Sequence, residues 1–155
     1  MCGESGLVTC LEHIFTFGFK SYKLFKKLYV WDFLEKAAYE IETLLNYPNI
    51  KSLGAKTSRN FYHEKFIAAI KAINSTSTNY GKDGKFQILI CLACRDSFLT
   101  EWFMILSRTN TATQMYDEFS FVRNHDLNKF CYKILSITDQ FNFKLENSLT
   151  MGIVY

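Results

Sequence analysis

The pair of residues whose spacing most suggests reactive chemistry is Cys91 and Cys94, two thiols separated by two residues. Such a pair can supply half of a zinc site or form a redox-active disulfide. A structural zinc ion needs four ligands, however, and His13, His63 and His125 are scattered along the chain. The two thiols also lie inside an apolar run, where cysteine packs as a small hydrophobic side chain. We therefore predict that Cys91 and Cys94 are buried and bind no metal.

A second candidate for chemistry is the adjacent pair His63 and Glu64, which could exchange a proton with a substrate. A small helical enzyme that uses this pair or the cysteine pair stays open as an alternative, and a pocket with shifted pKa values would favour it. His125 and Asp126 suggest two members of a hydrolase triad, but the chain contains no GxSxG nucleophile elbow. The simpler interpretation is that Asp126 caps a helix.

A third segment, residues 80–85, contains Gly-Lys twice and shares this feature with phosphate-binding loops. It lacks the Gly-Lys-Ser or Gly-Lys-Thr ending of such a loop, and no strand is predicted to precede it. A turn that starts the following helix is the simpler interpretation. A third interpretation makes Lys82 and Lys85, with Arg95 nearby, an exposed basic corner that meets an acidic partner surface. The sequence predicts no catalytic residue, no cofactor and no metal site.

The longest periodic segment lies between residues 21 and 46, where apolar residues recur at steps of three and four. This spacing predicts one helix with a buried stripe, which Pro48 ends because proline disfavours helix in the residue before it. The lysines between residues 20 and 27 would lie on the solvated face, although such a run could also touch an anionic membrane. The predicted stripe consists of Leu24, Leu28, Trp31, Leu34, Ala38, Ile41 and Leu45.

Two further helices are predicted, one before and one after the helix at residues 21–46. A short one covers residues 7–17 and ends at Gly18. Another begins at Ser58, whose hydroxyl suits an N-cap. The buried face of this second helix would contain Tyr62, Phe66, Ala69, Ile70 and Ile73.

The second half of the chain begins with an apolar run over residues 86–94, which we assign to a central helix. This helix continues, or restarts at residues 96–97, as far as Arg108. The pattern is looser over residues 109–125, and residues 141–145 are expected to form a turn into a last short helix. A helix capped by Asp126 lies between them and would bury Leu127, Phe130, Ile134 and Ile137.

The composition favours an all-α, compact multi-helix bundle that forms a single domain over residues 1–155. Hydrophobic residues make up 48% of the chain, and a single proline leaves long uninterrupted segments for helices. A net charge of +3 is too small to mark a nucleic-acid-binding protein. Five cysteines, an odd number, suit a reducing compartment, and the chain does not begin like a signal peptide. We therefore expect a cytoplasmic protein that binds no nucleic acid.

Several short blocks follow one another in a recognisable order. They are residues 31–35 (WDFLE), 53–56 (LGAK), 60–66 (NFYHEKF), 70–73 (IKAI), 80–86 (YGKDGKF), 116–123, 127–138 and 141–145 (FNFKL). In this order the chain resembles the RUN domain, in the form found in FYVE and coiled-coil domain adaptors of autophagy and late endosomes. The resemblance covers about residues 28–150, which leaves residues 1–20 as an N-terminal helical extension.

The resemblance implies a RUN-like bundle that acts as a non-enzymatic adaptor and binds a Rab- or Arf-like small GTPase in endosome, lysosome or autophagosome transport. It also implies motor or membrane-tethering proteins as partners, and attachment to these membranes through partners alone. The residues expected at the partner surface are Lys82, Lys85, Arg95 and Arg123. A degenerate copy that keeps the fold and binds nothing is a further alternative.

Overall fold

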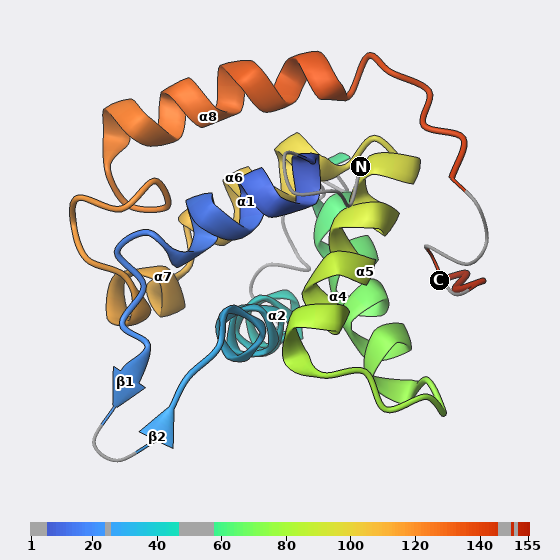
Figure 1. Cartoon of the computed structure of the whole chain (residues 1–155), viewed down its shortest axis with the longest axis horizontal. Helices are drawn as coiled ribbons and strands as arrows, with labels where there is room; N and C mark the ends of the chain where they lie inside the picture. Colours follow the sequence, from blue (N-terminus) through green and yellow to red (C-terminus); the bar gives the residue numbers. More distant parts are fainter. Residues whose placement is uncertain (1–5, 24–25, 47–57, 146–149, 151) are drawn as a thin grey trace.

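The computed structural model of the chain describes residues 6–23, 26–46, 58–145, 150 and 152–155. In this part of the chain the helices form a bundle in which α2 lies between α7 and the pair α4 and α5, and one short hairpin projects from it (Figure 1). This arrangement confirms the predicted all-α fold. The elements are α1 (Leu7–Thr16), β1 (Tyr22–Lys23), β2 (Lys26–Lys27), α2 (Val30–Asn46), α4 (Ser58–Ser75), α5 (Lys82–Arg95), α6 (Leu99–Ser107), α7 (Asn110–Met115) and α8 (His125–Thr138).

The lysine-rich segment ahead of α2 is a hairpin, so the prediction of one helix from residue 21 is wrong. Its two strands, β1 and β2, pair in antiparallel register. The Tyr29 N–H donates a hydrogen bond to Asp32 Oδ2 at 2.8 Å, so that a side chain of the first turn reaches back to the residue before the helix. This is half of a capping box, and it fixes the start of α2 at Val30. Leu24, which was assigned to the helical stripe, lies outside the described residues.

The first helix ends at Gly18, as predicted. The Phe17 N–H donates to the His13 carbonyl at 3.0 Å, and Gly18 then adopts a φ of +71°. This left-handed conformation is the usual way for a helix to stop, and glycine adopts it without strain. The chain next runs alongside the segment after α7, because Lys20 N–H donates to the Met115 carbonyl at 2.9 Å and Asp117 N–H donates to Gly18 at 2.8 Å.

The core forms where α2 packs against α4, α5 and α7. The face predicted for α4 is confirmed, because Phe66, Ala69, Ile70 and Ile73 are buried and Tyr62 is half-buried. α2 ends at Asn46 as expected, although Pro48 and the block at residues 53–56 lie outside the described residues. The buried face of α2 consists of Trp31, Phe33, Leu34, Ala37, Ala38 and Ile41.

The central apolar segment is two helices, as the alternative of a restart predicted. α5 ends in a Schellman motif, in which Phe98 N–H donates to the Ala93 carbonyl at 2.8 Å and Ser97 N–H donates to Cys94 at 3.3 Å. Ser97 occupies the left-handed position with a φ of +56°. The turn changes the direction of the chain, so that α6 runs at an angle to α5 (Figure 1). α8 packs against α6.

The segment that the sequence pattern left without structure contains α7. Its N-cap is Thr109, whose hydroxyl accepts a hydrogen bond from Ala112 N–H at 3.1 Å. The following helix, α8, is capped by Asn124 rather than by the predicted Asp126. The Asn124 side chain accepts hydrogen bonds from two backbone N–H groups, those of Asp126 and Leu127, at 3.1 Å each. Asn124 therefore holds the N-terminus that was assigned to Asp126.

The prediction for the buried face of α8 is also wrong. α8 packs on α6 through Cys131 and Leu135. Of the residues predicted to be buried, Leu127 is half-buried, while Phe130, Ile134 and Ile137 are exposed. Residues 141–145 are irregular, as expected, and the closing helix predicted after them falls largely outside the described residues. Within the described ranges, no helix is both long enough and apolar enough to cross a membrane.

Candidate interaction surfaces

Lys82 lies at the first position of α5, next to the end of the hairpin. Its ammonium group pairs with Asp32 Oδ1 at 2.6 Å and lies 5.0 Å from the centre of the Tyr29 ring. The Lys27 ammonium lies at the same distance from that ring. Cations are attracted to the face of an aromatic ring, so Tyr29 holds two lysines that are far apart in the sequence. The Lys82 charge is oriented by Asp32 and is not free.

Lys85 lies on the next turn of α5 and completes the cluster. Its ammonium donates to Asn74 Oδ1 at 2.7 Å and lies 5.8 Å from the Trp31 ring. The Asn74 amide in turn donates to Glu35 Oε1 at 2.9 Å. We call Lys27, Lys82 and Lys85 the basic corner. The sequence predicted that Lys82 and Lys85 lie together, but it placed Lys27 on a helix, because the hairpin that carries it was not predicted.

Arg95 lies at the other end of α5, about 20 Å along the helix axis from Lys82. Its guanidinium donates to both carboxylate oxygens of Asp96 at 2.8 and 2.9 Å, and to the Ile153 carbonyl at 2.9 Å. The hydrogen bonds to Asp96 raise the pKa of Arg95. Burial raises the pKa of Tyr155, whose hydroxyl also donates to Asp96 at 2.8 Å. These contacts attach the C-terminal residues to α5.

Arg123 has a similar role on the segment before α8. Its guanidinium donates to the Tyr116 carbonyl at 3.0 Å and lies 3.5 Å from the carboxylate of Glu118, whose side chain is 89% exposed. The four basic residues expected at one partner surface therefore do not form one patch. Lys82 and Lys85 lie together, whereas Arg95 and Arg123 lie elsewhere, and all four make bonds within their own chain.

Neither enzyme-like pair lines the two pockets described below for the part of the chain that the structure covers. Cys91 and Cys94 are buried, at 2% and 3% exposure, as predicted. Among the residues that the structure describes, no three histidine, cysteine or acidic side chains are arranged to hold a metal ion. His63 is half-buried on α4 and Glu64 is exposed. Neither of them lines the groove described next, nor a void of about 20 Å³ in the apolar core, which is too small for a substrate.

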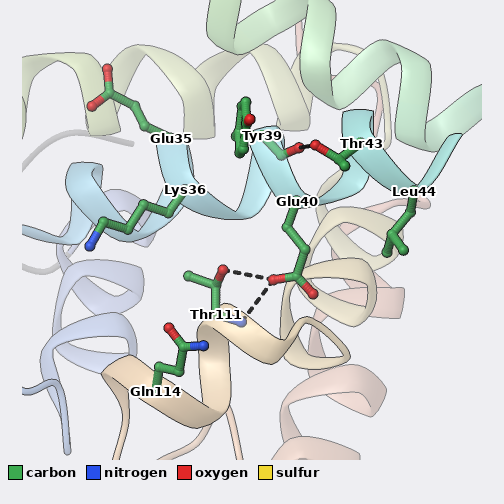
Figure 2. Close-up of a pocket in the computed structure, with 8 residues that line it drawn as sticks. All are labelled: Glu35, Lys36, Tyr39, Glu40, Thr43, Leu44, Thr111 and Gln114. Carbon is green, nitrogen blue, oxygen red and sulfur yellow. Dashed lines mark hydrogen bonds between the residues drawn. The ribbon is translucent and has the colours of Figure 1, made fainter. Parts of the chain in front are cut away.

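An open groove of about 580 Å³ lies between α2 and α7 (Figure 2). Glu40 crosses it. Asn110 N–H donates to Glu40 Oε1 at 2.7 Å, while the N–H and hydroxyl of Thr111 donate to Oε2 at 2.8 and 2.7 Å. Burial raises the pKa of Glu40, but these hydrogen bonds lower it more, and the pKa lies below its ordinary value. The carboxylate therefore caps the start of α7. The groove is lined by Glu35, Lys36, Tyr39, Glu40, Thr43, Leu44, Thr111 and Gln114.

Besides Phe61 on α4 and Val154 near the C-terminus, large apolar side chains are exposed in two other parts of the described structure. One is an aromatic corner, where Phe17 lies 5.6 Å from Phe119 and 5.4 Å from Phe121, measured between ring centres. The other is the outer side of α8, which the sequence pattern had assigned to the core. Exposed apolar side chains that lie together commonly mark binding surfaces.

The structure thus defines an all-helical bundle whose exposed features are charged and apolar surfaces, a form that suits an interaction module. The model of the RUN domain family matches residues 6–149, and the chain belongs to this family. The match confirms the resemblance found in the sequence, and it also includes α1. RUN domains are generally protein-interaction domains associated with small GTPase signalling. No solved structure matches the chain.

Proposed function

We propose that this RUN domain is a non-catalytic adaptor that binds a small GTPase of the Rab or Arf-like class. The observation that carries this proposal is the family match over residues 6–149, because RUN domains are generally associated with small GTPase signalling. The partner would recruit the domain from the cytoplasm to endosomal, lysosomal or autophagic membranes for vesicle transport. Motor and tethering proteins would be further partners of the same complex.

The basic corner is the surface proposed for the GTPase. Lys82 and Lys85 are held in defined positions by Asp32 and Asn74, at 2.6 and 2.7 Å. Charges that are already oriented lose little conformational freedom on binding, and they steer an acidic partner to the correct face. Arg95 and Arg123 contribute indirectly, because their bonds hold the C-terminal residues and the segment before α8 in place.

The test is direct binding to a panel of purified Rab and Arf-like GTPases, each loaded with GDP or with a non-hydrolysable GTP analogue. We expect at least one GTPase to bind in one nucleotide state. The variant should be Lys82→Gln with Lys85→Gln, because glutamate at position 82 would face Asp32 and destabilise the fold. We expect at least tenfold weaker binding, which corresponds to about 1.4 kcal/mol, and a smaller effect of salt.

Lys144→Gln is the matched control, since Lys144 is exposed and lies outside the basic corner. If the double variant keeps its melting temperature and binds with unchanged affinity and salt dependence, the GTPase does not bind at the basic corner. Absence of binding to every member of the panel in both nucleotide states would contradict the proposed function itself.

A further inference from the structure

The outer side of α8 exposes three large apolar side chains that the proposed function does not use. On the inner side Cys131 and Leu135 are each 3% exposed where α8 packs on α6. On the outer side Phe130, Ile134 and Ile137 are 56%, 46% and 54% exposed. Figure 1 shows α8 along the margin of the bundle, with helices on one side of it only. The packing on α6 therefore holds an apolar face towards solvent.

The spacing of these side chains is that of a helix-pairing seam. Phe130, Ile134 and Ile137 are separated by steps of four and three, and Phe141, one further step of four along, is 58% exposed just beyond the helix end. Steps of three and four correspond to the a and d positions of a heptad, which form a straight line along a helix and pack against a second helix. The face is thus shaped to receive a helix.

One edge of this seam is basic. Lys129 and Lys133 are exposed and lie one turn apart on this edge, with Lys133 directly beside the seam and Lys129 farther from it. Asp126, which is also exposed, lies seven residues before Lys133 and therefore on the same edge, so two lysines and one aspartate leave this edge with a net charge of +1. A helix that packs on the seam would place its own flanking residues opposite the two lysines, and acidic residues there would be attracted.

We infer that the outer face of α8 binds an amphipathic helix of a partner protein, whose apolar seam is flanked by acidic residues. A lipid surface fits this face less well, because α8 carries two lysines and one aspartate, whereas basic segments that bind anionic lipids carry four to eight Lys or Arg. A second copy of the chain also fits less well. In an antiparallel pair of α8 helices the twofold axis places both lysine edges on the same side, where they repel.

This site is separate from the basic corner. Lys82 lies at the N-terminus of α5, at the end of the bundle away from α8 in Figure 1. The inference does not depend on the identity of the GTPase, and it allows a helix and a GTPase to bind at the same time.

The experiment uses two synthetic helical peptides of about three heptads, both with Leu at the a and d positions. One carries Glu at the flanking e and g positions and the other carries Lys, so that like charges keep each peptide from pairing with itself. Binding to the full chain is measured by fluorescence anisotropy up to about 1 mM, a concentration that covers weak helix docking. We expect the acidic-edged peptide to bind at least tenfold more tightly than the basic-edged one.

Two variants locate the binding site. Ile134→Glu with Ile137→Glu should abolish binding of the acidic-edged peptide, and Lys129→Glu with Lys133→Glu should reverse the preference between the peptides. Leu44→Glu on α2 is the control, since Leu44 is also 49% exposed but belongs to another surface, and it should change nothing. The lysine variant leaves the apolar seam intact. Its reversal of the peptide preference therefore remains a valid test even if the isoleucine variant fails to fold.

Three outcomes would overturn the inference. The first is that neither peptide binds, or that both bind equally and the lysine variant has no effect. The second is a dimer in sedimentation velocity that Ile134→Glu with Ile137→Glu dissociates, which would assign the face to a second copy of the chain. The third is cosedimentation with phosphatidylserine vesicles that the same variant abolishes, which would assign it to lipid. GTPase binding is measured separately, so failure here leaves the proposed function intact.

Discussion

The contact between Glu40 and α7 offers the clearest quantitative test of the fold. α7 has only six residues, Asn110 to Met115, and its first N–H groups have no partners within the helix. Glu40, on α2, accepts three hydrogen bonds there, at 2.7 to 2.8 Å from Asn110 and Thr111. We predict that Glu40→Ala detaches the start of α7 from α2, and that Glu40→Gln weakens the contact without removing it.

The magnitude follows from the kind of bond that is lost. A hydrogen bond to a charged acceptor contributes about 1.5–3 kcal/mol, but water replaces part of it here because Glu40 is only half-buried. Removal of a helix cap costs about 0.5–2 kcal/mol. We therefore expect Glu40→Ala to lower the free energy of unfolding by about 2 kcal/mol, and the melting temperature of a chain of this size by roughly 4–8 °C. Glu40→Gln keeps a neutral acceptor and should cost about half as much.

The pH dependence provides an independent check. The hydrogen bonds hold the pKa of Glu40 below its ordinary value in the folded protein. The stabilisation is therefore complete above the unfolded pKa of about 4.3 and is lost as the pH falls through the lower, folded pKa. Urea unfolding of the wild-type chain and of Glu40→Gln should differ at pH 7 and converge in acid. Glu64→Gln, at an exposed carboxylate of α4, is the control and should match the wild type throughout. A difference in stability that widens as the pH falls, or equal losses for Glu40→Gln and Glu64→Gln at pH 7, would contradict this role of the Glu40 carboxylate.

Two further substitutions test the backbone and the core, each by urea unfolding. Gly18→Ala should cost about 1–2 kcal/mol for the left-handed conformation, and more because the new Cβ would lie 2.7 Å from Ser120 Cβ. Gly84→Ala, inside α5, should instead stabilise the chain by about 0.5–1 kcal/mol. A loss of stability in both variants, or in neither, would contradict the difference in backbone conformation between the two glycines. Tyr116→Phe should cost about 1–2 kcal/mol, because the buried hydroxyl donates to the Phe15 carbonyl at 2.8 Å and its removal leaves that carbonyl without a donor. An unchanged stability would show that water reaches the site.

The sequence predicted correctly those helices for which the apolar spacing and the residues at the ends indicate the same segment. α4 begins at Ser58 and buries Phe66, Ile70 and Ile73 because period and packing select the same face. The start of α2 could not be found in this way, since the apolar spacing continues through the hairpin. The local signal was Asp32, three residues after Tyr29, which is the position from which a side chain reaches back to cap a helix.

The remaining differences come from contacts between distant parts of the chain. Glu40 and Thr111 are 71 residues apart, so no local sequence pattern predicts that Glu40 caps α7. Lys27 joins Lys82 only because the hairpin brings both to the Tyr29 ring. Arg95 follows Lys85 closely in sequence, but the length of α5 separates them. Charges on one helix form a patch only if they share both a face and an end of it.

The error at α8 says most about function. Periodicity finds the largest apolar stripe of a helix, and here that stripe is Phe130, Ile134 and Ile137, which faces solvent. Full burial of an apolar side chain contributes about 1.5–3 kcal/mol, and these three are already about half-buried, so a partner helix would gain about 2–5 kcal/mol from them. That gain is of the order of the cost of association itself, about 4 kcal/mol or more. The stripe alone would therefore support only weak binding, and the basic edge of Lys129 and Lys133 must select the partner. Weak docking becomes effective when a second contact raises the local concentration, and a GTPase held at the other end of the bundle would provide such a contact.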